Sequence, residues 1–447
     1  MRQSSKINFL FAAFALSVAG FTASAQEVIT IQQAIDKTLS NNLQVKQAQF
    51  SAALADETYS QSKYALLPTI SGNANASRNF GRSIDPSTNQ FISQRFDGVS
   101  GSLNGSVDLF AGGQKINQIK QNKLLLAADI ANVEKIKNDL ILQVVTSYMQ
   151  ILFNKDLLKA AEAQLVVAKQ TLNQQQQLLD VGNKTLADVS QAKSQVAISE
   201  LDVTNAQNNL AISYLTLNQL MELPSDNKFE AQAPVIDAIT IAKNSESAPE
   251  VVAAALNAFP DIKLASLRSQ AAQRSINVAR ATYFPRLSFG GGLGSNYSSR
   301  FSALTGRTFY DQIQDNFNQF IGFSLSIPVF NGFQARSNVR RAKINYQNAQ
   351  VNEQLSKNNL NKVIFQAVAD LRAAESRYQS TTNAFAAQKD AFFVIEQRYN
   401  VGLANSVEFS TAQTNRNKAE IDMIQAKYDL LFKSKVIDYY LGKQIVF

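Results

Sequence analysis

Val107-Asp108-Leu109-Phe110-Ala111-Gly112 recurs about 220 residues later as Ile327-Pro328-Val329-Phe330-Asn331-Gly332. At the same offset, Asp180-Val181-Gly182-Asn183 recurs as Asn400-Val401-Gly402-Leu403. In each copy the first segment ends a stretch of two-residue periodicity, and the second ends a long helical pattern. Self-similarity at one fixed offset indicates an internal duplication. We therefore expect two repeats, each with strands followed by long helices.

The amino-acid composition excludes several classes of protein. The chain contains no Cys, no His and no Trp. It therefore has no thiol nucleophile, no imidazole acid or base and no Cys/His zinc cluster. We expect neither an enzyme nor a resident metal or cofactor. The net charge is +8, or +6 without Arg2 and Lys6 at the N-terminus, and this excess is spread along the predicted helices, so a nucleic acid is not an expected partner.

The N-terminus has the order of charged, apolar and small residues that is typical of a secretory signal peptide. Arg2 and Lys6 precede an apolar run over 7–21, and small residues follow up to Ala25. A transmembrane anchor is the weaker alternative because the run is shorter than the ~20 residues of a spanning helix. Cleavage between Ala25 and Gln26 is expected. Without Cys the mature chain cannot carry a lipid anchor on that residue.

Two regions predict β-hairpins, at 66–110 and 284–330, with loops near 81–94 and 299–315. From Val99 to Leu109, apolar or glycine positions alternate with Ser, Asn and Asp, and the segments 287–297 and 321–329 have a similar alternation. An uncharged apolar face opposite a face of hydroxyl and amide groups is the pattern of outer-membrane strands, which face lipid on one side and water on the other. A pair of hairpins in an ordinary α+β domain is the alternative.

Four strands are too few for a closed membrane barrel. Every backbone donor and acceptor inside a bilayer needs a partner, so several chains must combine their strands. Barrels close from about eight strands, and a wide lumen needs more. A dimer with eight strands would close a tight barrel, whereas a homotrimer with twelve strands in outer-membrane lipid would leave room for a lumen and is the expected assembly.

Long helices follow both hairpins, over 113–181 and 332–400. From Ile116 to Leu179 a heptad seam of mostly apolar residues continues without Pro or Gly, which predicts one coiled-coil-like helix of roughly 100 Å. Shorter helical patterns flank each long helix and should stack end to end beside it, so that three chains supply twelve rods. The expected organisation is a signal peptide at 1–25, a first repeat at 26–222 with a return helix at 185–222, an equatorial linker at 223–260, and a second repeat at 261–447 with a return helix at 405–441 and a C-terminal tail.

The turns between the long and the return helices are the most specific local motif. Gly182 and Gly402 fit the position just past a helix C-terminus, where positive φ favours glycine. The next helices begin with the patterns of capping boxes, which end in Asp188 and Glu408. Capping alone explains both acids. The alternative is that both acids cap their helices and also form a cation-selective gate, because six such acids would ring the narrow end of a trimeric tube.

Four kinds of short segment occur twice and in the same order. They are the strand starts Leu67-Pro68 and Phe284-Pro285, the strand ends Phe110-Ala111-Gly112 and Phe330-Asn331-Gly332, the turns Val181-Gly182 and Val401-Gly402, and the helix starts Asp188-Val189-Ser190-Gln191-Ala192 and Glu408-Phe409-Ser410-Thr411-Ala412. With these segments in this order, the chain resembles the outer-membrane efflux protein family, the trimeric channel-tunnels of Gram-negative bacteria. The resemblance covers essentially the whole mature chain. The resemblance implies a mixed α and transmembrane β fold, in which a twelve-stranded outer-membrane β-barrel continues into a twelve-helix periplasmic α-barrel.

The resemblance also implies a passive exit duct of a tripartite efflux or type I secretion system. Its partners would be a periplasmic adaptor and an inner-membrane transporter of RND, ABC or MFS type, and most of its mass would lie in the periplasm. The adaptor would dock on the hairpin tips, which comprise Val181, Gly182, Asn183, Val401, Gly402 and Leu403.

The same resemblance points to a gate at Asp188, Glu408 and Thr411. Thr411 stands where some members have a second acid, and Ala404 where some have a basic residue that ties the gate shut. Lys184 is the counterpart of Ala404 in the first hairpin. This sequence therefore departs from both the doubled acidic ring and the basic latch of those members. Drug, metal and protein export stay open as functions, and a soluble periplasmic coiled-coil scaffold or adaptor is the alternative to a channel.

Overall fold

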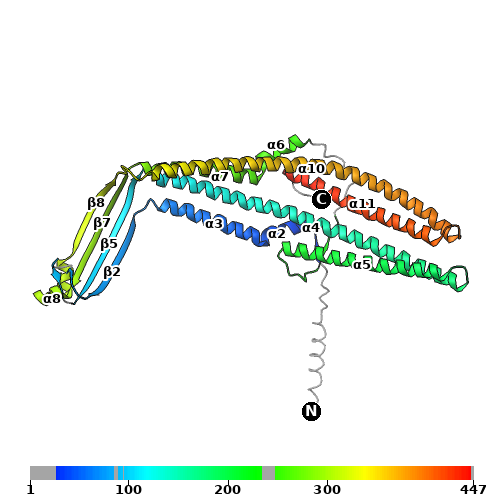
Figure 1. Ribbon diagram of the computed structural model, residues 1–447, viewed down its shortest axis with the longest axis horizontal. Coiled ribbons are helices and arrows are strands. Elements are labelled where there is room, and N and C mark those ends of the chain that lie inside the picture. The colour runs from blue at the N-terminus through cyan, green and yellow to red at the C-terminus, as the bar shows by residue number, and fades with distance from the viewer. Residues whose placement is uncertain (1–26, 85–88, 94, 234–246, 444–447) are drawn as a thin grey trace, which may run out of the picture.

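The computed structural model describes residues 27–84, 89–93, 95–233 and 247–443. The predicted signal peptide with its cleavage site, part of the linker and the last residues of the tail lie outside the described residues. The chain is elongated, with the strands at one end and the two helical hairpin tips at the other (Figure 1). Among the described residues, no helix is both long enough and apolar enough to span a lipid bilayer.

Four strands form one antiparallel sheet in the order β2 (Thr69–Asn79), β5 (Phe96–Ala111), β7 (Arg286–Ser298) and β8 (Asn318–Ser326). The two predicted hairpins therefore lie side by side, joined through β5 and β7. The register places Val107 opposite Phe289, and Phe289 opposite Phe323. Directly paired residues share one face of a sheet, so the apolar positions of the two hairpins form one continuous apolar face.

The segments predicted as loops contain secondary structure, so this part of the prediction is wrong. A small hairpin of β3 (Ser83–Ile84) and β4 (Phe91–Ile92) lies within 81–94. Two short helices, α8 (Ser299–Thr305) and α9 (Phe309–Asp315), occupy 299–315. The cause for α9 is a capping box, in which Thr308 Oγ1 accepts a hydrogen bond of 3.3 Å from the Asp311 amide, and Asp311 Oδ2 accepts one of 2.9 Å from the Thr308 amide.

The two long helices are α4 (Gln114–Asp180) and α10 (Gln334–Asn400), each with 67 residues. The return helices are α5 (Leu186–Leu220) and α11 (Ser406–Tyr440), each with 35 residues. At 1.5 Å per residue, a long helix extends for roughly 100 Å. Both long helices are continuous, as the unbroken heptad seam of the first predicts.

Shorter helices continue the line of each return helix. α3 (Leu43–Tyr64) and α5 lie along α4, while α7 (Pro260–Arg280) and α11 lie along α10 (Figure 1). Where α3 meets α5, Asn42 Nδ2 donates a hydrogen bond of 3.0 Å to the Leu220 carbonyl oxygen. Where α7 meets α11, the ring of Phe259 lies 5.1 Å from that of Tyr439 and 5.3 Å from that of Tyr440. The first junction is polar and the second is aromatic.

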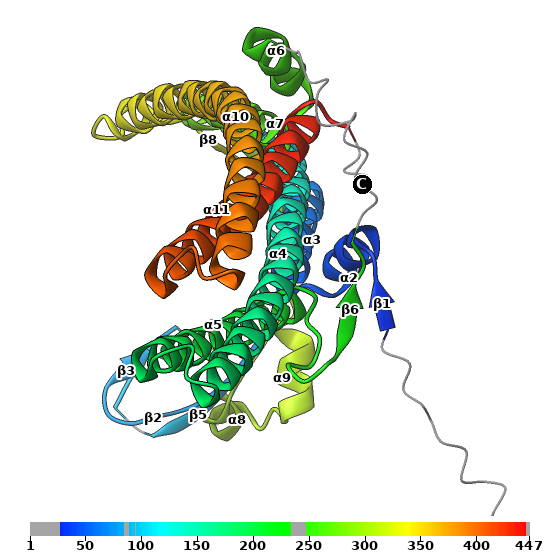
Figure 2. The same ribbon diagram turned by 90° about the vertical axis from the view of Figure 1, so that its right-hand side faces the viewer.

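The remaining elements pack against the outer side of the helical layer. α2 (Ile31–Asn41) and a two-stranded parallel pair of β1 (Glu27–Ile29) and β6 (Phe229–Ala231) pack on α4, and α6 (Ala248–Ala258) packs on α10 and α11. Figure 2 shows α2, β1 and β6 together on one side of the layer. The hydroxyl of the buried Tyr148 lies 2.7 Å from the Ile29 carbonyl oxygen and 2.8 Å from that of Gln232. Burial raises the pKa of Tyr148 to about 12. This residue therefore joins α4 to the covering elements.

Candidate functional site at the hairpin tips

Both tips turn through a glycine that the backbone geometry requires. Gly182 has φ +77° and Gly402 has φ +79°, a region that strongly favours glycine. No atom lies within 4 Å of a Cβ built at either position, so crowding does not explain these glycines. The amide of Asn183 donates 2.8 Å to the Leu178 carbonyl, and that of Leu403 donates 2.8 Å to Arg398. These are the 6→1 hydrogen bonds of a Schellman motif, and they end α4 and α10.

The two return helices are capped differently. In the first, Thr185 Oγ1 accepts from the Asp188 amide at 3.3 Å, and Asp188 Oδ2 accepts in return from the Thr185 amide at 3.0 Å. In the second, Asn405 Oδ1 accepts from the Glu408 amide at 2.8 Å. Among the described residues, no bond returns from the Glu408 carboxylate to Asn405. The Glu408 side chain is therefore exposed and free of the cap, whereas Asp188 is held by it.

Asp188 also connects the two hairpins. Hydrogen bonds from the Thr185 amide, the Ser406 hydroxyl and the Thr185 hydroxyl hold the pKa of this carboxyl below its usual range, with a smaller contribution from the charge of Lys184. Ser406 begins α11, so one of these donors comes from the opposite hairpin. A second link joins Gln174 Nε2 to Asn400 Oδ1 at 3.4 Å. The two tips of one chain are thus in polar contact.

An aromatic cluster supports the second tip. The rings of Tyr399 and Phe409 stack with centroids 4.6 Å apart, and Phe392 lies 5.5 Å from Phe409. Ala404 is buried in this cluster. The Lys184 ammonium, from the first tip, lies 4.4 Å from the centroid of the Tyr399 ring. At this distance a cation is attracted by the face of the ring.

A small cavity of about 20 Å³ lies between the tips, beside Asp188, Ser406 and Tyr399. It has room for about one water molecule. The buried Gln175 side chain also lines it. Burial raises the pKa of Tyr399, the negative charge of Asp188 raises it further, and Gln175 opposes the rise.

The structure brings only part of the predicted gate together. Asp188 lies at the contact between the hairpins, but Glu408 and Thr411 are exposed and do not line the cavity. Tyr399 and Gln175 were not predicted. Tyr399 lies two residues before Val401-Gly402, at the position that Leu179 occupies in the first repeat. This difference between the repeats was the available signal. The described residues contain no group of three or more acidic side chains placed to hold a metal ion.

The predicted docking residues lie at the extreme end of the molecule, where they are accessible. Val181, Val401 and Leu403 are all about 70% exposed, at 68%, 71% and 69%. Leu186 and Val407, at the starts of the return helices, are equally open. Each tip therefore presents apolar side chains next to a polar cap.

A model of the family described as "Outer membrane efflux protein" matches residues 34–222 and 251–443. The chain belongs to this family. Both matched ranges contain strands of the sheet as well as long helices, so the family covers the whole architecture and the scaffold alternative is not favoured. As a member of this family, the chain is an outer-membrane protein that functions in efflux.

Relatives of known name agree over nearly the full length. The chain is 22% identical over 424 residues to the outer membrane efflux protein BepC of Brucella suis biovar 1 (strain 1330), covering 95% of this chain and 87% of the relative. It is 22% identical over 442 residues to the outer membrane protein TolC of Escherichia coli (strain K12), covering 96% and 85%.

Solved structures show the same fold. A crystal structure of CusC matches with a TM-score of 0.77 at 19% identity and covers 92% of both chains. The outer membrane protein VceC of Vibrio cholerae matches with a TM-score of 0.76 at 17% identity and covers 92% of this chain and 96% of the other. The chain therefore has the fold of these channel proteins.

Proposed function

We propose that three copies of this outer membrane efflux protein form one exit duct, with the strands in the outer membrane and the helices crossing the periplasm. The observation that carries the proposal is a four-stranded sheet with two open edges, β2 and β8, within the described chain. Open edges leave backbone groups without partners, which a bilayer does not tolerate. Edge-to-edge pairing of three copies closes a barrel of twelve strands with an open lumen.

The helical end supports the same number of copies. Four rods continue from the four strands: α3 with α5, α4, α7 with α11, and α10. Three chains would bring both the strands and the rods to twelve. The sheet face that carries Ile321, Phe323 and Leu325 is exposed in the single chain, in agreement with contact to lipid.

At the other end, the apolar tips suit docking to partner proteins. We propose that Val181, Gly182, Asn183, Val401, Gly402 and Leu403 meet a periplasmic adaptor, and that an inner-membrane transporter supplies substrate and energy. CusC and VceC have the same fold, and the turns at the tips of this chain carry exposed apolar groups. We assign no catalytic role to the chain.

The contacts between the tips suit a closed state of the duct. The approach of the Asp188 carboxylate to Ser406 and the Lys184 to Tyr399 contact each bring one hairpin against the other. Opening requires the hairpins to separate, so these contacts favour closure. Asp188 and Glu408 would favour cations near the entrance, whereas Thr411 adds no charge. Ala404 packs among aromatic side chains and carries no charge. In this chain Lys184 instead supplies the cation, in its contact with the Tyr399 ring.

Cysteine cross-linking tests the assembly, because the chain has no native Cys. A chain with one Cys on β2, at Ala74, and a second placed in turn at Gln319, Ile321 and Phe323 on β8 should form covalent trimers in isolated outer membranes for at least one pair. Each single-Cys chain, as the control, should stay monomeric on a denaturing gel. A soluble monomer in periplasmic extracts would overturn the proposal, as would dimers from a single Cys.

A further inference from the structure

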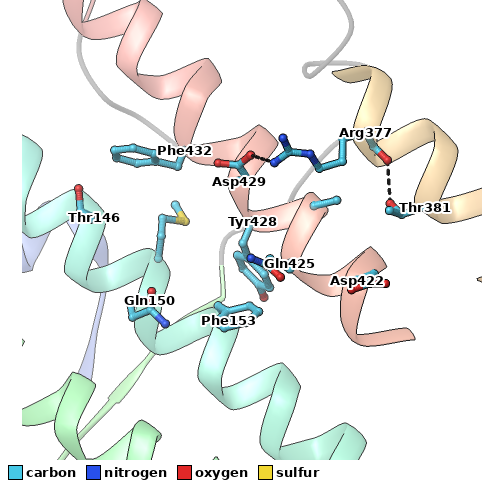
Figure 3. A pocket seen from close by; sticks show the side chains of 12 residues that line it. Thr146, Gln150, Phe153, Arg377, Thr381, Asp422, Gln425, Tyr428, Asp429 and Phe432 are labelled. Atoms are coloured by element: carbon cyan, nitrogen blue, oxygen red, sulfur yellow. Dashed lines mark hydrogen bonds and ion pairs between the residues drawn. The ribbon is translucent and has the colours of Figure 1, made fainter. Parts of the chain in front are cut away.

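A cavity of about 450 Å³ lies near the middle of α4, where α10 and α11 run beside it (Figure 3). This volume is within the ~300–1,000 Å³ typical of small-molecule sites. The cavity is far along the chain from the residues of the tips and belongs to neither the proposed gate nor the docking surface. Its lining combines aromatic side chains with charged ones.

Three aromatic side chains line the cavity: Phe153 on α4, and Tyr428 and Phe432 on α11. Phe153 and Tyr428 meet edge to face, with centroids 6.2 Å apart and an interplanar angle of 75°. The Tyr428 hydroxyl donates a hydrogen bond of 2.7 Å to Asp156 Oδ2, which fixes this ring. Aromatic faces attract both apolar groups and cations.

The charges on the lining are unequal. Arg377 Nη1 lies 3.3 Å from Asp429 Oδ2, so these two form an ion pair across the cavity between α10 and α11. Asp422 is exposed and forms no ion pair with any residue that the structure describes. The cavity therefore has an excess of one negative charge. Its one arginine is already neutralised, which makes an anion the less favoured occupant.

The cavity faces away from the covering elements. Tyr148 on α4 points to β1 and β6, and successive residues of an α-helix are turned by about 100°. Thr146, Gln150 and Phe153 are thus on the opposite side of α4 from Tyr148, and all three line the cavity. Figure 2 shows the covering elements on one side of the layer. In the proposed trimer, the free side faces the interior of the duct.

We propose that this cavity binds organic cations with an aromatic or apolar body, as a station along the exit path. The aromatic side chains take the body of the ligand, and the carboxylate of Asp422, unpaired among the described residues, attracts its charge. The position along the exit path rests on the function proposed above, whereas the binding itself does not.

A tryptophan reporter makes the binding measurable at this site. The natural chain has no Trp, so Phe432→Trp gives one fluorophore in the cavity wall and keeps an aromatic ring there. Purified Phe432→Trp protein in neutral detergent is titrated with tetraphenylphosphonium and, separately, with tetraphenylborate. The two probes have nearly the same shape and apolar surface but opposite charge. Saturable quenching by the cation at lower concentration than by the anion is expected.

Asp422→Asn on the same background should raise the apparent Kd for the cation by up to about fivefold, the effect of losing one exposed charge pair. Asp202→Asn is the matched control, since Asp202 is exposed on α5, far from the cavity lining, and should leave the Kd unchanged. The comparison is made at constant detergent, so partitioning of the probe into micelles cancels. Phe153→Leu, which removes one aromatic wall, should also weaken the binding of the cation. Equal cation affinity in the Asp422→Asn and Asp202→Asn proteins would overturn the proposal, as would preference for the anion.

The same proteins are then examined in planar bilayers. Conductance with no saturable cation binding would reject the cavity inference alone. Saturable, Asp422-dependent binding without trimers or conductance would reject the proposed duct and leave the binding site standing.

Discussion

The Lys184 ammonium lies 4.4 Å from the centroid of the Tyr399 ring, so one hairpin supplies the cation and the other supplies the aromatic face of a single contact. The contact lies beside Asp188, whose carboxylate accepts hydrogen bonds from Thr185 of its own tip and lies beside Ser406 of the other. The Lys184 to Tyr399 contact and Asp188 together hold the two tips of one chain against each other.

Replacing Lys184 with Ala should loosen the closed tips. An exposed cation–π contact contributes about 0.5–1 kcal/mol, which corresponds to a rise of about two- to fivefold in the open population. Single-channel recording should show longer or larger openings. Lys184→Arg should stay close to the natural protein because it keeps the cation. Lys193→Ala, which removes an exposed lysine elsewhere on α5, is the control; equal effects at both positions would refute the contact.

Asp188→Asn should remove a pH-dependent contribution to the start of α5. The folded state lowers the pKa of Asp188, so the stabilisation is present above the unfolded pKa of ~3.9 and is lost as the pH falls through the lower folded value. A charged group at a helix N-terminus contributes about 0.3–1 kcal/mol. Hydrogen exchange of residues 186–190 at pH 6 should be faster in the variant, with the difference shrinking toward pH 3. Glu408→Gln should change the exchange of α11 less, since Glu408 has no return bond; a larger effect there would contradict this account.

Thr411→Asp should increase cation selectivity. Thr411 is exposed one helical turn after Glu408, so a carboxylate there adds to the negative potential at the tips of all copies. The cation-to-anion permeability ratio from reversal potentials should rise by about twofold at low salt and less at high salt, where charges are screened. Thr411→Asn is the uncharged control, and a similar shift in that variant would exclude the electrostatic cause.

Ala404→Leu should destabilise the second tip. Ala404 is buried against Tyr399 and Phe409, and overpacking a filled cluster costs about 1–3 kcal/mol. Limited proteolysis should cut the 400–406 turn faster than in the natural protein. Ala386→Leu, at an exposed position of α10, should have little effect. Equal cutting of both variants would show that the cluster is not tightly packed.

Much of the fold follows from local sequence signals. The heptad seam predicts α4 because each apolar residue repeats the helical period, and the turn glycines are predicted because positive φ is a property of one residue. The helix α9 was missed although Thr308 and Asp311 form a readable capping box. Its segment was assigned as a loop from its position between two strands.

The contacts between distant segments could not be predicted in the same way. The Lys184 to Tyr399 contact depends on how two hairpins lie against each other, and no local period records that. The cavity at Phe153, Asp422 and Arg377 needs three helices at once. Each of these residues, taken alone, looks like an ordinary position on an amphipathic helix. Only the packing of α4, α10 and α11 brings them together.

The two junctions between stacked helices differ in the kind of contact that holds them. The Asn42 to Leu220 hydrogen bond joins α3 to α5 in one direction and at one length, so bending there breaks it. The rings of Phe259, Tyr439 and Tyr440, where α7 meets α11, can slide over one another and keep most of their contact area. We therefore expect the junction of α7 and α11 to tolerate more bending than the junction of α3 and α5. If the tips move apart, we expect the bending to occur at the aromatic junction before it occurs at the polar one.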